Sequence, residues 1–127
     1  MTTIVTDGIS QEWQDWEDAS QQGGHVKGQI NWKDLLHDKS PDYSAGFAKQ
    51  SKGTVVDWDR FEIDEFLYLL KGRMKAEDYD DGTTYMAKPG DFTYIKRGSK
   101  VKQTFEEESE TFFVLVPKYD PSMERRD

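Results

Sequence analysis

Asp59 and Glu65 are the side chains of this sequence best placed to do chemistry, because both lie in the aromatic-rich segment WDRFEIDEFLYLLKG. If this segment is a β-strand, its side chains alternate between two faces, and the two carboxylates share one face. A carboxyl group among Phe and Leu side chains is partly desolvated, which favours its protonated form. Glu65 is therefore a candidate general acid or base, with Asp59 as the second carboxyl group. The alternative is a structural role, in which a buried Glu65 is hydrogen-bonded to the backbone or to a lysine.

The same alternation predicts which apolar side chains surround Glu65. Phe61, Ile63 and Leu67 share its face of the strand. Together they would form a pocket with apolar walls and few polar groups, which is how small-molecule sites are built.

The opposite face of this strand carries an apolar stripe of Phe66, Tyr68 and Leu70. A stripe of this kind is unfavourable in water. We therefore expect it to pack against a second subunit, giving a homodimer, or against the N-terminal residues, with Trp32 as a candidate to cover it.

An all-β fold must position these strands. From Ser44 onward, short runs rich in aromatic and β-branched residues recur, among them AGFAKQ, TVVDW, TTYMAK, DFTYI and ETFFVLVP. Turn signals separate the runs, and the Asp81-Gly82 pair predicts a hairpin. Many short strands at such spacing are typical of a sandwich, a jelly roll or a barrel.

The organisation predicted from this pattern is a single domain with two polar ends. Residues 44–117 form the β-barrel core, and residues 118–127 form a polar tail. Residues 1–43 are expected to be an N-terminal extension that packs on the barrel or on a partner, with a short strand or a helical turn around NWKDLL.

Composition excludes several classes of function. The net charge is −8, which argues against nucleic acid or an anionic membrane as the partner, because phosphate contacts need clustered Lys and Arg. The chain has no cysteine, so it has no disulfide and no thiolate chemistry. No apolar run is long enough to span a membrane, and the first residues do not read as a secretory signal, so we expect a cytoplasmic protein.

The glycines of this region have the spacing of two conserved motifs. Gly53 and Gly72 flank Glu65, and Gly90 and Gly98 flank the segment DFTYIKR. This spacing resembles the cupin family, in which the first motif supplies two metal-binding histidines and a glutamate and the second supplies a third histidine. In this chain the three histidine positions are occupied by Asp59, Phe61 and Val101, while Glu65 matches.

The segment from AGFAKQ to FFVLVP is similar, more narrowly, to the cupin domain of the ethanolamine-utilization protein EutQ and to small EutQ-like cupins. The resemblance covers residues 44–117. It implies a single-domain cupin jelly-roll barrel, all-β and dimeric. In the family that this segment resembles, an acetate-kinase-like activity is associated with a longer protein. This sequence contains no Walker-type phosphate loop, so the resemblance does not predict that activity for this chain.

The register of the second motif implies that Val101, Gln103 and Phe105 also face the interior of the barrel. With the first motif they give a ligand pocket whose polar groups are Asp59, Glu65 and Gln103. An oxygen-only set of this kind suits Mg²⁺, Ca²⁺ or Mn²⁺ better than zinc or iron. Because Phe61 and Val101 occupy two of the positions where a transition metal would need imidazole, we expect no metal and no other cofactor.

These observations lead to one main functional prediction and two alternatives. The main prediction is a metal-independent cupin that binds a small molecule inside the barrel, as a metabolic accessory protein. The first alternative is an enzyme that uses Asp59 and Glu65 on a small carboxylate or a phosphorylated metabolite. The second alternative is a structural dimer whose barrel is filled by side chains.

Overall fold

The computed structural model of the chain describes residues 5–9, 12–15, 26–36, 39–40, 42–58 and 62–117. Its elements are all β-strands, as predicted. They are β1 (Gln14–Asp15), β2 (Val26–Lys27), β3 (Ile30–Asp34), β4 (Ser44–Gln50), β5 (Val55–Trp58), β6 (Asp64–Lys71), β7 (Met74–Asp78), β8 (Thr84–Ala87), β9 (Phe92–Ile95), β10 (Val101–Phe105) and β11 (Ser109–Val116). None of the described residues forms a helix with the length and hydropathy needed to cross a bilayer.

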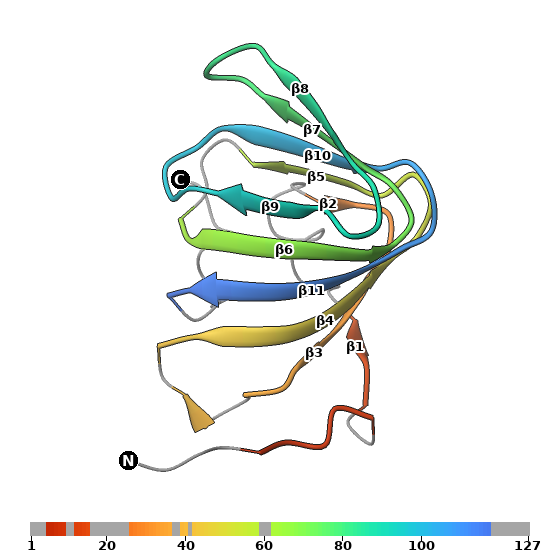
Figure 1. The fold of residues 1–127 in the computed structure, drawn as a ribbon, viewed down its shortest axis with the longest axis vertical. Coiled ribbons are helices and arrows are strands. Elements are labelled where there is room, and N and C mark those ends of the chain that lie inside the picture. Colours follow the sequence, from red (N-terminus) through yellow and green to blue (C-terminus); the bar gives the residue numbers. More distant parts are fainter. Residues whose placement is uncertain are drawn as a thin grey trace.

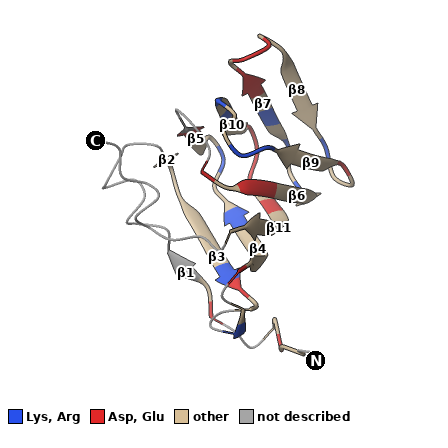
Figure 2. Cartoon of the chain, turned by 90° about the vertical axis from the view of Figure 1, so that its left-hand side faces the viewer, with Lys and Arg blue, Asp and Glu red and all other residues tan. Residues whose placement is uncertain are grey.

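The strands form two antiparallel sheets that curve around a common interior (Figure 1). The six-stranded sheet has the order β1-β3-β4-β11-β6-β9, and the five-stranded sheet has the order β2-β5-β10-β7-β8. This arrangement is the predicted jelly-roll barrel. The predicted hairpin joins β7 to β8, with Gly82 in a left-handed conformation and acidic residues at its tip (Figure 2).

The glycines of the two motifs lie in turns, as their spacing in the sequence predicted. Gly53, Gly72, Gly90 and Gly98 all have a positive φ, of 85°, 94°, 95° and 90° respectively. At Gly72 a Cβ atom would also collide with Oγ of Ser109. The turn from β6 to β7 therefore requires glycine for both its backbone conformation and its space.

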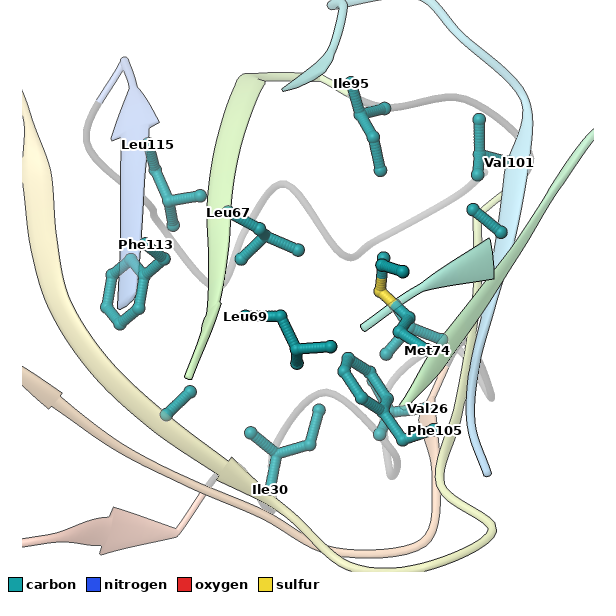
Figure 3. Packing of buried hydrophobic residues seen from close by; sticks show 14 of the residues in the cluster. Val26, Ile30, Leu67, Leu69, Met74, Ile95, Val101, Phe105, Phe113 and Leu115 are labelled. Atoms are coloured by element: carbon teal, nitrogen blue, oxygen red, sulfur yellow. The ribbon is translucent and has the colours of Figure 1, made fainter. Parts of the chain in front are cut away.

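The core lies between the two sheets. Leu67 of the six-stranded sheet points toward Met74 and Phe105 of the five-stranded sheet (Figure 3), and Phe113 belongs to the same buried cluster. Buried and partly buried residues alternate along the whole of β11. This period of two gives the six-stranded sheet one face that lines the core and one outer face.

Residues before position 44 supply strands to both sheets. β3 pairs with β4, and β2 pairs with β5. The strand alternative around NWKDLL is therefore correct. On the outer face of the six-stranded sheet, Gly8 lies beside the ring of Phe47, while the Nζ atoms of Lys33 and Lys49 lie 4.4 and 4.3 Å from the ring centre of Trp13. Among the described residues of the N-terminal segment, Gly8 and Trp13 thus cover the β3–β4 side of that face.

The expectation that Trp32 covers the outward stripe of β6 is wrong. Trp32 stands opposite Ala48 in the β3–β4 register, so it lies on the inner face. Its ring centre is 6.3 Å from that of Phe113, and it packs against the buried core.

The outward stripe packs instead beside the aromatic residues of β9. Phe66 stands opposite Tyr94, and the two rings are stacked at 4.9 Å with an angle of 14°. Tyr68 stands opposite Phe92. Phe92 and Tyr94 are still 64% and 50% exposed, so this half of the outer face presents a band of aromatic side chains.

Candidate functional site

A cavity of about 70 Å³ lies inside the barrel, between the two sheets. Ile63, Glu65 and Leu67 contribute to its wall from β6 and the turn before it, and Gln103 and Phe105 contribute from β10. The structure therefore brings these predicted site residues together around one space. Their roles as catalytic or ligand-binding residues stay predictions.

Glu65 and Gln103 form a polar pair in this cavity. The side-chain amide nitrogen of Gln103 donates a hydrogen bond to Oε1 of Glu65 over 3.0 Å. The same nitrogen lies 3.6 Å from Sδ of Met74. Gln103 is 2% exposed, so its amide is fixed within the protein.

The cavity changes the acidity of Glu65. Its carboxyl group is removed from water among apolar side chains, and this desolvation raises the pKa of Glu65 from 4.5 to about 7. The hydrogen bond from Gln103 acts in the opposite direction, since it stabilises the carboxylate, but its effect is smaller. Glu65 is therefore poised to gain or lose a proton near neutral pH.

A second polar pair in the cavity wall was not predicted from the sequence. The side-chain amide nitrogen of Gln50 donates a hydrogen bond to Oγ1 of Thr111 over 2.9 Å. Both side chains line the cavity, and Gln50 is 4% exposed. The alternation of AGFAKQ contained the signal, because Gln50 shares a face with the buried Ala48.

Val101 is placed differently from the other predicted site residues. It is buried, but it lines a separate groove of about 530 Å³ between the β7–β8 hairpin and β9. That groove is walled by exposed side chains such as Tyr85, Phe92 and Tyr94. It lacks the buried polar pairs of the cavity, which is why we regard the cavity as the candidate site.

Two predicted residues, Asp59 and Phe61, lie outside the described residues. Together with Glu65 and Val101, they occupy the positions that the cupin resemblance implies for metal ligands. Neither Phe61 nor Val101 has a side-chain atom that could coordinate a metal. Among the described residues there is no group of three or more His, Cys, Asp or Glu that could hold a metal ion. The described part of the site does not fit a transition metal.

The comparisons with known proteins agree with this fold. A family model described as "Ethanolamine utilisation protein EutQ" matches residues 11–120. None of the curated proteins matches the chain. Among solved structures, the EutQ protein of Clostridium difficile is 27% identical, with a TM-score of 0.60 over 72% of this chain and 70% of that chain.

Two further structures share the fold at lower identity. A putative ethanolamine utilization protein Q from Salmonella typhimurium LT2 is 24% identical, with a TM-score of 0.67 over 89% of this chain and 85% of that chain. KdgF from a Halomonas species is 21% identical, with a TM-score of 0.71 over 94% of this chain and 99% of that chain. Because the family model spans most of the chain, this protein belongs to the EutQ family of cupins.

Proposed function

We propose that this protein binds a small molecule with a largely apolar body inside the barrel, without a metal ion. The observation that carries the proposal is the hydrogen-bonded Glu65–Gln103 pair on the wall of an apolar cavity. A few fixed polar groups among apolar walls are the general composition of a ligand pocket. The names of the EutQ relatives support a place for it in ethanolamine utilisation. We further propose that it acts as a cytoplasmic accessory protein.

The charge of the cavity wall limits the ligand. Among the described residues that line the cavity, only Glu65 has an ionisable side chain, and none is Lys or Arg. An anionic group placed here would be desolvated without a counter-charge, which is strongly unfavourable. The wall therefore favours an uncharged ligand over a carboxylate or a phosphorylated metabolite.

The size of the cavity limits the ligand further. Its volume of about 70 Å³ is roughly half that of the cavity, ~150 Å³, that holds benzene in an engineered protein. The ligand is therefore a small molecule, or the narrow end of a larger one. Space of this size also supports ligand binding over the alternative of a barrel filled by side chains.

A fragment screen by nuclear magnetic resonance tests the proposal. Binding in the cavity should shift the side-chain amide signals of Gln103 in ¹⁵N-labelled protein. The matched control is Ala48→Leu, because Ala48 lines the cavity and a larger side chain there would occupy it. The proposal is wrong if no fragment shifts these signals, or if the shifts are the same in the filled variant.

An enzyme is the second candidate, and the pKa of Glu65 near 7 is the observation in its favour. A general acid or base works best when its pKa lies near the working pH. For any substrate found in the screen, Glu65→Gln should abolish turnover while the melting temperature is retained. If turnover survives this substitution, Glu65 is not the catalytic group. The contribution of Asp59 stays a prediction.

We also propose that two copies of the chain associate through the aromatic band on the outer face of the six-stranded sheet. The described residues of the N-terminal segment cover the β3–β4 side of this face, whereas Tyr68, Phe92 and Tyr94 are 42%, 64% and 50% exposed. A contiguous apolar area of this kind on a sheet is typical of a protein–protein interface. Because the band lies on one face of one sheet, the same surface on two copies can pair about a twofold axis.

A further inference from the structure

The Gln50 side chain has a polar atom that the protein does not satisfy. Its carbonyl oxygen, Oε1, is buried and has no hydrogen-bond partner among the described residues. A buried acceptor without a partner is unusual, because the free energy of its lost hydration is not recovered.

Thr111 satisfies the nitrogen end of the Gln50 amide. The Nε2 atom of Gln50 donates to Oγ1 of Thr111 over 2.9 Å, and Thr111 is itself buried. The amide group is planar, so its nitrogen and oxygen point in different directions. Because the nitrogen donates to Thr111 on β11, the oxygen needs a different hydrogen-bond partner.

The surroundings of Gln50 are apolar, and they form part of the cavity. Trp32, Ala48 and Phe113 line the same space. The other polar pair of the cavity, Glu65 with Gln103, lies toward the opposite end of the sheet. In the β11–β6 register Glu65 stands opposite Leu115, four residues along β11 from Thr111, which corresponds to about 13 Å of strand.

We propose that Gln50 Oε1 is a recognition group for a ligand with a hydrogen-bond donor. The ligand is a small uncharged molecule, or the end of one, that carries a hydroxyl or an amide N–H beside an apolar body. Its donor meets Gln50, and its apolar part contacts the aromatic walls of the cavity. This inference rests on the proposed function and adds the chemical class that the cavity selects.

Three probes of nearly the same size test the donor requirement. 2-Propanol and acetamide each carry a donor, whereas acetone has the same skeleton and carries none. Titration of ¹⁵N-labelled protein, followed through the side-chain amide signals of Gln50 and Gln103, gives the dissociation constant of each probe. We expect 2-propanol and acetamide to bind about tenfold more tightly than acetone, the difference that a single satisfied hydrogen bond makes.

The variant that removes the recognition group is Gln50→Leu combined with Thr111→Val. Replacing both partners with apolar groups avoids a new unpaired atom, so the barrel should stay folded. In this variant the preference for the two donor probes should disappear, while acetone binds as before. Lys49→Met is the matched control, because Lys49 is the neighbouring residue on β4 and is exposed.

The outcomes separate this inference from the proposed function. If all three probes bind the unaltered protein equally, or if the preference survives in the double variant, Gln50 is not the recognition group and only the present inference is overturned. If no probe shifts either signal, both the inference and cavity binding are overturned. The comparison of probes in the unaltered protein decides between these results even if the double variant does not fold.

Discussion

Gln103 of the five-stranded sheet donates a hydrogen bond to Glu65 of the six-stranded sheet, and this bond crosses the interior of the barrel. It therefore links the two walls of the cavity, and it couples the position of β10 to the protonation of a carboxyl group on β6. Changes at either residue should alter both the stability of the barrel and its dependence on pH.

Glu65→Gln should change how stability depends on pH. The pKa of Glu65 is about 7 in the folded protein, against an ordinary value of 4.5. The folded state thus holds the proton more tightly than the unfolded chain, so the free energy of unfolding falls as the pH rises through the interval between these values. Between pH 5.5 and 8.5 this loss amounts to about 2 kcal/mol, and it should be absent from the variant.

Urea denaturation of both proteins at these two pH values measures the effect. Glu107→Gln, which alters an exposed carboxyl group in the turn before β11, is the control for the change in net charge. Equal pH dependence in Glu65→Gln and the unaltered protein would show that Glu65 is not desolvated in the folded state.

Gln103→Leu should raise the pKa of Glu65 further, because the hydrogen bond that it removes favours the carboxylate. Above neutral pH the variant should lose about 1–3 kcal/mol of stability, since a buried carboxylate loses its donor. Titration of the Glu65 carboxyl carbon by nuclear magnetic resonance gives the pKa. Glu65→Leu combined with Gln103→Leu is the control, because removing both partners should be less destabilising than removing the donor alone.

The protein purified without a chelator should contain no stoichiometric iron, zinc or nickel, because Val101 provides no ligand and the described residues hold no suitable cluster. Elemental analysis by mass spectrometry measures the metal content. Addition of a chelator should leave the melting temperature unchanged. One transition-metal ion per chain, with a lower melting temperature after chelation, would contradict the proposed metal independence.

Phe92→Ser combined with Tyr94→Ser should convert a homodimer into monomers, because both side chains belong to the exposed aromatic band. Sedimentation velocity at micromolar concentration measures the change. Tyr79→Ser is the control, because Tyr79 is 54% exposed but follows β7 on the five-stranded sheet. A monomeric unaltered protein would refute the proposed interface.

Much of the site could be predicted from local pattern alone. Strand alternation around Glu65 placed Ile63 and Leu67 on the inner face, because a side-chain period of two holds wherever a strand has no bulge. Glycines with a positive φ mark turns, and the spacing of Gly72 and Gly98 therefore indicated where strands end. These features depend on a few neighbouring residues, so the sequence contains them.

The features that could not be predicted depend on distant contacts. The residues around Trp32 show no clear periodicity, and their strand is defined by pairing with β4, so the side on which Trp32 lies could not be predicted. Val101 is buried as expected, but the separation of the cavity from the neighbouring groove is set by the packing of both sheets. The unpartnered oxygen of Gln50 depends on the orientation of one amide group.

The place of β11 in the sheet order has a consequence for how the barrel is made. β11 comes last among the described strands, yet it lies between β4 and β6 and pairs with both. Until residues 109–116 have left the ribosome, β4 and β6 each have an open edge that can pair with another chain. The barrel can therefore close only after β11 has been made, and a chain truncated before Ser109 should aggregate rather than form a smaller barrel.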